Sequence, residues 1–299
     1  MSMKENVALM NTSTDDTYNI KELQNAILQI AQYIHDFCIE NEIEYCLMGG
    51  SALGAKRHGG FIPWDDDLDI FMTAQGYEKF RATFLEKGDK ERFYLQEQGV
   101  IKGRVRKPKL RMNDTTYIED GIENLKMHHG IFVDIFILHN CPDNKVLQLW
   151  QCAWSKYIVI KSLSNQHYKK RTGYIQILLR FLRLFPAHFL INRAYKELYR
   201  YDYKETKLCC NFIGKAIYKS GIYEKADLWP AKPVAFETIE LLVPGKVESF
   251  LTKRFGDYMK IPSKDKIRYD QHAKIWSTKE SFTNYVNEDS NYQDEKVLI

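Results

Sequence analysis

A run of acidic residues leads directly into an apolar segment early in this chain, and few folds accommodate both. Residues 61–71 read FIPWDDDLDIF, with aspartate at positions 65, 66, 67 and 69. Successive side chains of a β-strand alternate between its two faces, so Asp67 and Asp69 are predicted to point the same way. Their Cα atoms would lie ~7 Å apart at ~3.3 Å per residue, so both carboxylates can reach one ion.

Carboxylates this close repel one another, which raises the pKa of one of them unless a cation intervenes. Hard oxygen ligands of this kind select Mg²⁺ or Mn²⁺. A third acid, Asp134, lies in the strongest predicted strand, GIFVDIFIL at 130–138, where an unpaired carboxylate would be costly. If the two strands are neighbours, Asp67, Asp69 and Asp134 form a three-carboxylate metal site. The alternative is a solvated acidic turn.

A glycine-rich stretch, LMGGSALGAKRHGG, precedes the acids. A strand that ends in Gly49, Gly50 and Ser51 and enters a helix leaves backbone N–H groups free to hold phosphate oxygens. Such a turn is weak evidence alone, since a Gly-Gly pair is usually only a turn. Its position just before the acid pair gives it weight.

The order of strand, Gly-Gly-Ser turn, helix, D-x-D strand and later strand with one aspartate resembles the nucleotidyltransferase superfamily, which has the polymerase-β-like fold. The string GGSALGAKRHGGFIPWDDDLDIFM resembles the LicD family of phosphotransferases, and so do HHGIFVDIFIL and VPGKVESFLTKRFGDYMKIP. This family includes phosphocholine transferases of bacterial surface glycans and ribitol-phosphate transferases related to fukutin. The resemblance is dense over 43–72 and 128–138, fainter over 92–118, present again over 236–262 and absent from 143–220.

The resemblance implies metal-dependent transfer of a phospho-alcohol, with phosphocholine from CDP-choline as the first candidate. The acceptor would be a sugar hydroxyl of a glycan or lipid-linked oligosaccharide, such as a teichoic acid or lipopolysaccharide precursor, and CMP would leave. Asp67 and Asp69 would hold the metal, and Asp134 would be a further ligand or the base. Gly49, Gly50 and Ser51 would hold the diphosphate.

Two other functions remain open. One is a true nucleotidyltransferase, which moves a nucleoside monophosphate to a small molecule and releases pyrophosphate. The other is a catalytically inactive nucleotide-binding regulator, although three retained acids argue against it.

Arg57 and His58 follow the short predicted helix and are candidate substrate-binding residues. Arg57 either clamps a phosphate with its fork of donors or pairs on the surface with Asp65 or Asp66. His58 either binds substrate or orders the loop.

Further substrate-binding candidates lie on both sides of the Asp134 strand. Lys109 and Arg111 alternate with Lys107 along a β-like stretch, so the three share a face that is either solvated or meets phosphate. An aromatic box for a quaternary ammonium would use cation–π attraction, with ordinary packing as the alternative for each ring. Its candidates are Trp64 and Tyr117, and His272 is a further candidate.

The predicted fold class is α/β of the α+β type, with a mixed nucleotidyltransferase (polymerase-β-like) sheet and a helical insertion. We expect a flexible N-terminus over 1–19 and a catalytic core over 20–142. Within the core, the pattern predicts a helix over 21–40 and two or three antiparallel strands over 92–118. The buried face of the helix would hold the apolar residues Leu23, Ile27, Ile30, Ile34 and Phe37. A helical insertion or acceptor-binding region follows over 143–235, and a C-terminal segment over 236–299 packs back on the core.

Composition narrows the partners and the compartment. The chain has 299 residues and a formal net charge of +4, which is too weak a charge to indicate a nucleic-acid partner. There is no signal-like apolar N-terminus, and the six cysteines form no C-x-x-C pair. We therefore expect reduced thiols and a cytoplasmic protein. The apolar and basic segment 174–193 is either a core helix or a peripheral contact with the inner face of the membrane.

Overall fold

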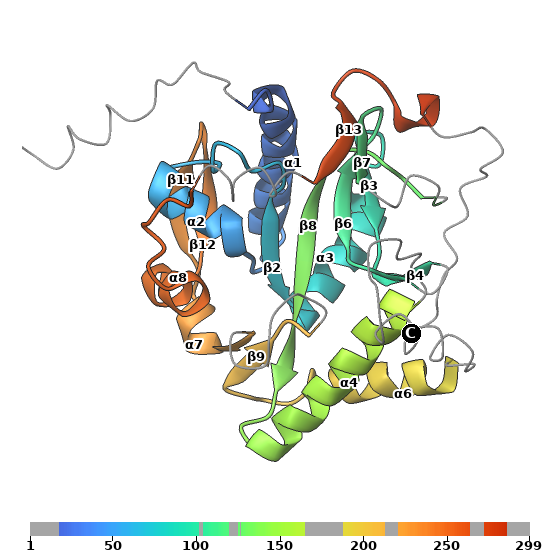
Figure 1. Cartoon of the computed structure of the whole chain (residues 1–299), viewed down its shortest axis with the longest axis vertical. Coiled ribbons are helices and arrows are strands. Elements are labelled where there is room, and N and C mark those ends of the chain that lie inside the picture. The colour runs from blue at the N-terminus through green and yellow to red at the C-terminus, as the bar shows by residue number, and fades with distance from the viewer. Residues whose placement is uncertain are drawn as a thin grey trace, which may run out of the picture.

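Two parallel strands form the centre of the protein, and antiparallel strands extend the sheet on both sides (Figure 1). The computed structural model describes residues 18–101, 104–119, 125, 127–164, 188–212, 221–263 and 272–285. The main path of the sheet follows the order β1 (Cys46–Leu47), β2 (Asp69–Thr73), β8 (Phe132–Cys141), β6 (Lys109–Met112) and β3 (Phe93–Gln96). Strand β8 also pairs with β9 (Leu208–Cys210), which pairs with β10 (Ile222–Glu224).

The register of the central pair fixes which side chains lie side by side. Strands β2 and β8 are parallel, and Asp69 is the register partner of Asp134. Strands β1, β6, β3 and β9 join by antiparallel pairing. The predicted α+β class with a mixed sheet is therefore confirmed.

Two helices pack against the central strands. Helix α1 (Lys21–Glu40) contacts β8 and β6, and α3 (Ala74–Lys87) contacts β2 and β8. The apolar stripe predicted for the first helix is buried: Leu23, Ile27, Ile30, Ile34 and Phe37. Burial of this stripe is what holds the helix, because propensity alone seldom stabilises an isolated helix.

The C-terminal part returns to the core. Helix α2 (Gly49–His58) follows β1 directly and contacts α8 (Val247–Phe255), β2 and β11 (Lys232–Phe236). Strand β11 forms a hairpin with β12 (Ile239–Val243), which contacts β1 and α1. Helix α7 (Lys225–Leu228) contacts α8, which ends at Gly256 with a φ of 69°.

The region 143–235, which was expected to be a helical insertion, contains strands β9, β10 and most of β11 besides its helices. Helices α4 (Lys145–Ser164) and α6 (His188–Tyr199) pack on each other and form a second, smaller apolar cluster with β9. Figure 1 shows this pair at the far end of β8. The pairing of β9 with β8 was not predicted.

The segment 92–118 holds more strands than the two or three expected. Besides β3 and β6, it contains β4 (Gly99–Ile101), β5 (Arg104–Arg106) and the first part of β7 (Thr116–Glu119). Strand β7 pairs with β13 (Ala273–Ser277), which a short 3-10 helix, η1 (Phe282–Asn284), follows.

All six cysteines are buried free thiols, as predicted. Within the described ranges, no helix combines the length and apolar character that spanning a membrane requires. Of the segment 174–193, only residues 188–193 belong to the described part, where they begin α6.

Candidate active site

Asp69 and Asp134 lie side by side on the two parallel strands, and Asp67 lies two residues before Asp69. Burial, together with the charges of Asp67 and Asp134, raises the pKa of Asp69 well above its ordinary range. Burial also raises the pKa of Asp67, and the negative charge of Asp134 raises it further. The structure therefore brings together the three acids that the sequence singled out.

Two lysines from the neighbouring strand region hold Asp134. Lys107 Nζ lies 2.6 Å from Asp134 Oδ2, and Lys109 Nζ lies 3.0 Å from Oδ1. Burial alone would raise the pKa of this carboxyl, but the two lysines lower it to about 2. Asp134 is therefore a permanent charge at neutral pH and a weak base.

The predicted shared face of the three basic residues is confirmed. Lys107 lies over the ring of Phe136, and both Lys109 and Arg111 lie over the ring of Phe132. Arg111 is fully buried, and it donates hydrogen bonds to Gln96 Oε1 (3.0 Å) and the Gly130 carbonyl (2.9 Å). These contacts tie Arg111 into the sheet and favour a structural role over phosphate binding.

The glycine turn lies next to the acids. Gly49 adopts a positive φ of 53°, and a Cβ at Gly50 would lie only 2.8 Å from Asp65 Oδ2. The Ser51 hydroxyl oxygen accepts a hydrogen bond from the Asp69 backbone N–H at 2.8 Å. The turn and the acidic strand are thus joined directly.

A basic residue that the sequence had not singled out lies at the same turn. The Arg254 guanidinium, from α8, would be 3.6 Å from a Cβ at Gly49, and it donates to the Tyr223 hydroxyl at 3.2 Å. Its segment resembled the family, but nothing local marked this arginine.

Arg57 and His58 contact each other and the C-terminal return. Arg57 Nε donates to His58 Nε2 at 2.9 Å, and Nη1 donates to the Tyr258 carbonyl at 2.8 Å. Burial and the charge of Arg57 lower the pKa of His58 to about 4, so this histidine is neutral at physiological pH. Within the described residues, Arg57 makes no ion pair with Asp65 or Asp66, which was one of its two predicted roles.

Trp64 and Tyr117 are packed in the core. Trp64 is 7% exposed and lies against Tyr18 and His58, with ring centroids 6.0 and 6.3 Å away. Tyr117 is 1% exposed and packs on Phe132. The packing alternative fits both rings better than an open aromatic box.

Asp66 and Asp67 are neighbours with different environments. The carboxylate of Asp66 is buried and accepts hydrogen bonds from the backbone N–H groups of His272 and Ala273, at 2.6 and 2.9 Å. His272 Nδ1 lies 3.1 Å from Asp66 Oδ1 and 3.9 Å from Asp67 Oδ2. Asp66 thus anchors the C-terminal return. His272, a substrate-binding candidate from the sequence, lies beside the acid site.

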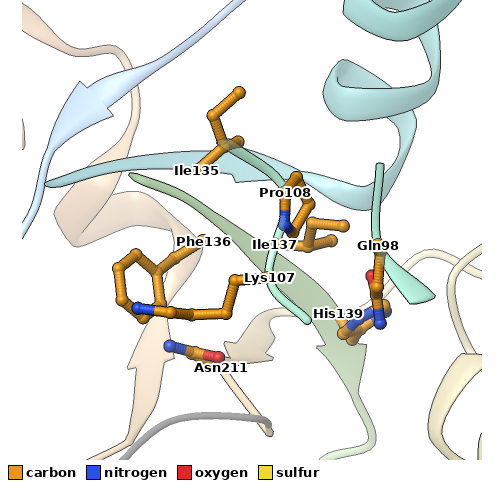
Figure 2. Close-up of a pocket in the computed structure, with 8 residues that line it drawn as sticks. All are labelled: Gln98, Lys107, Pro108, Ile135, Phe136, Ile137, His139 and Asn211. Carbon is orange, nitrogen blue, oxygen red and sulfur yellow. The ribbon is translucent and has the colours of Figure 1, made fainter. Parts of the chain in front are cut away.

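A small cavity adjoins the site beyond Lys107. Its volume is about 20 Å³, which is room for a water molecule or two and far too little for a nucleotide. Figure 2 shows the Lys107 side chain lying along the Phe136 ring, with Asn211 close by and His139 and Gln98 on the other side. His139 is fixed there by Asp202, 2.8 Å from its Nδ1.

The fit of a divalent cation rests on Asp69. Its Oδ1 is buried, and no hydrogen-bond partner for it is present among the described residues. Within the same residues, no group of three His, Cys, Asp or Glu side chains is arranged as a metal site, and Asp134 is paired with lysines instead. The oxygen donors of Asp67 and Asp69 fit Mg²⁺ or Mn²⁺. Participation of Asp134 as a third ligand stays a prediction.

Comparison with known proteins gives consistent matches. Residues 42–157 match the family profile described as "LicD/FKTN/FKRP, nucleotidyltransferase domain". The lipopolysaccharide cholinephosphotransferase LicD of Haemophilus influenzae is 26% identical over 264 residues, which cover 82% of this chain and 93% of that protein. The ribitol 5-phosphate transferases FKRP of Homo sapiens and Mus musculus are each 36% identical over 78 residues, 25% of this chain and 16% of theirs.

Proposed function

We propose that this protein moves a phospho-alcohol from a nucleotide-activated donor to a sugar hydroxyl of a cell-surface glycan precursor. The premise is that residues 42–157 are a LicD-family domain and that the protein is a transferase enzyme. The observation that carries the proposal is the register pairing of Asp69 with Asp134, with the buried Asp69 Oδ1 left without a partner. Such a centre suits charge neutralisation on a diphosphate.

Phosphocholine from CDP-choline is the group we propose, with CMP as the leaving nucleotide. The support is the similarity to a cholinephosphotransferase over most of both chains. That relative's name includes lipopolysaccharide, and we propose a lipopolysaccharide or teichoic acid precursor as the acceptor. A cytoplasmic reaction at the inner face of the membrane is part of this proposal.

Asp67 and Asp69 would hold the divalent cation, which supplies positive charge to the diphosphate oxygens when it is bound. Ser51 positions Asp69 by accepting a hydrogen bond from its backbone N–H. Gly49 and Gly50 leave the backbone open to phosphate oxygens, and Arg254 lies near enough to contribute a charge-assisted hydrogen bond.

Lys107 would face the developing charge. Its side chain is 34% exposed, whereas that of Lys109 is 7% exposed, so Lys107 is the more accessible cation to an incoming phosphate. With a pKa of about 2, Asp134 is better suited to orienting this lysine than to removing the proton of the acceptor hydroxyl. A loose phosphoryl-transfer transition state needs little help from a base.

The arrangement also fits our proposal of a nucleotidyltransferase (polymerase-β-like) core. The two acid-bearing strands are adjacent, and a turn-to-helix connection lies beside them, as that fold requires. The matched profile carries the same description.

The test is to incubate the full chain with Mg²⁺ and CDP-choline, CDP-ribitol, UDP- or GDP-linked donors in turn. We expect CDP-choline to raise the melting temperature and to be slowly hydrolysed to CMP without pyrophosphate. Asp69→Asn should remove the hydrolysis, by at least about a hundredfold, since such a centre contributes several kcal/mol to the barrier.

Asp36→Asn is the matched control, because Asp36 is an exposed acid on α1, where it accepts from Gln32. It should hydrolyse donor at the wild-type rate. A parallel incubation with CTP in place of the diphosphate donors tests the nucleotidyltransferase alternative, which pyrophosphate release from CTP would favour. Binding without turnover in every incubation would favour the regulator. Full activity of Asp69→Asn would refute the proposal.

A further inference from the structure

Helix α4 exposes a continuous apolar stripe to solvent. Val146, Leu149, Trp150 and Ile160 are 72%, 54%, 49% and 41% exposed. With exposed Ala153 and half-buried Tyr157 between them, they follow helical spacing along one side of the helix, and we call these six residues the α4 stripe.

The buried side of the same helix carries polar side chains besides Cys152 and Ile158, which join the second apolar cluster. Gln148 donates to the Pro142 carbonyl at 2.8 Å, Gln151 donates to the Leu198 carbonyl at 3.2 Å, and the Ser155 hydroxyl donates to the Phe212 carbonyl. All three side chains are less than 9% exposed. A surface helix of a globular protein normally buries its apolar side and exposes its polar side. In α4, three polar side chains are buried while the apolar stripe is exposed, so packing against the core does not account for the stripe.

Basic residues surround the stripe. Helix α4 contains Lys145, Lys156 and Lys161 and no acidic residue, and the first two are exposed. Arg193 on α6 and Arg200 just after it each contact Glu197, at 2.7 and 3.2 Å, and their side chains are both 54% exposed.

Trp150 joins the stripe to these arginines. Its Nε1 lies 3.2 Å from Glu197 Oε2, the oxygen that Arg200 also contacts. The indole therefore exposes apolar surface while its polar tip is satisfied, next to two cations. Tryptophan with basic neighbours is typical of the water–lipid boundary.

We propose that the α4 stripe lies on an anionic lipid surface, with Lys145, Lys156, Arg193 and Arg200 facing the head groups. The apolar side chains enter the head-group boundary, and the basic residues near the surface strengthen binding through their attraction to anionic lipid. The stripe and its cations carry this inference independently of the transferase activity. Α second copy of the chain fits less well, because the same basic residues would face each other across a symmetric contact.

The experiment is co-sedimentation of the full chain with phosphatidylcholine vesicles that contain either no phosphatidylglycerol or about a quarter of it. The probe is the vesicle alone, without donor or acceptor. We expect binding to the anionic vesicles, with weaker binding at high salt. The double variant Val146→Ser/Leu149→Ser should bind at least about tenfold more weakly, since it removes two exposed apolar side chains from the interface.

The matched control is Ile39→Ser, which changes a 56% exposed apolar residue on α1. It should bind vesicles as the wild type does. Equal melting temperatures for all three proteins would show that the stripe variant is folded. No sedimentation of the wild type, or equal sedimentation of wild type and stripe variant, would overturn the proposal. The proposal would also be overturned, in favour of a second copy, if light scattering showed the wild type as a dimer and the stripe variant as a monomer.

Discussion

Two ammonium groups share the carboxylate of Asp134, and their surroundings differ. Lys109 is almost fully buried, and burial lowers its pKa. At Lys107 the opposing effect of burial is outweighed by the charges of Asp134 and Asp69, and the pKa is raised. We infer that Lys109 is the fixed partner of Asp134 and that Lys107 is the one available to substrate.

This difference predicts unequal losses of stability. Lys109→Met should lower the free energy of unfolding by about 3 kcal/mol, because it breaks a buried pair. Lys107→Met should cost about 1 kcal/mol, because its partly exposed side chain is screened by water. Urea unfolding of both variants measures the two losses. Equal losses would contradict the assignment of Lys109 as the fixed partner.

The pKa of the Asp134 carboxylate predicts that the stability of the protein depends on pH. The pKa of Asp134 is about 2 in the folded protein, below the ~3.9 of an unfolded aspartate. Its contribution of about 2–3 kcal/mol is therefore present above pH ~4 and is lost as the pH falls toward 2. Asp69 has a raised pKa and acts in the opposite direction.

Urea unfolding of wild type and Asp134→Asn between pH 7 and pH 2.5 separates these effects. The stability difference between the two proteins should shrink as the solution is acidified. A difference that is constant with pH would show that the lysines do not stabilise the charged form.

For single residues, the sequence predicted which face of a strand a side chain lies on better than it predicted what that side chain does. Strand alternation placed Asp67 with Asp69 and the three basic residues on one face, because that periodicity is local. It did not distinguish Asp66, whose hydrogen-bond partner His272 lies 206 positions away. Nor did it mark Arg254, which reaches the glycine turn only through the packing of α8 on α2.

Helix α2 connects the glycine turn to the loop that leads into the acids. A Cβ at Gly54 would lie 2.4 Å from the Gly60 carbonyl oxygen and 3.2 Å from the Ile62 nitrogen. Because both atoms belong to the backbone, neither can rotate away. The close approach of helix and loop thus depends on this glycine.

Gly54→Ala should therefore destabilise the protein by about 1–3 kcal/mol through overpacking. Gly59→Ala is the comparison, because a Cβ there has no neighbour within 4 Å and only the φ of 70° is strained, at about 1–2 kcal/mol. Donor hydrolysis should fall only in the first variant, since only there is the acid loop displaced. Unimpaired hydrolysis by a folded Gly54→Ala protein would contradict this.

Long periodic elements were predictable and short paired ones were not. Helix α1 and strand β8 were predicted near their observed bounds, because each has an apolar pattern of its own. Strand β9 has three residues and lies between helical patterns. Its conformation follows from pairing with β8, so no local signal could have found it.

On the scale of the whole molecule, Asp66 links the loop before β2 to the last described segment of the chain. It accepts two backbone hydrogen bonds from the start of the segment 272–285, which contains β13. These bonds, with those of His272, lower the pKa of Asp66 despite its burial. The carboxylate therefore stabilises the return of the chain to the core.

Asp66→Asn should cost about 2 kcal/mol, because it weakens charge-assisted hydrogen bonds inside the protein. Hydrogen exchange should show lost protection in β13 and in its partner β7. Asp67→Asn is the neighbouring control, since the Asp67 carboxylate lies 3.9 Å from His272 Nδ1, beyond hydrogen-bond distance. Equal loss of protection in both variants would contradict an anchoring role specific to Asp66.

Strand β8 runs from the acid site toward α4 (Figure 1). From Asp134 to Cys141 it spans seven residues, or ~23 Å at ~3.3 Å per residue. If α4 rests on lipid, the strand would hold the reacting atoms up to about that height above the bilayer. A glycan tethered to the membrane would then be modified only once its growing end extends that far, so the strand would act as a ruler for acceptor length.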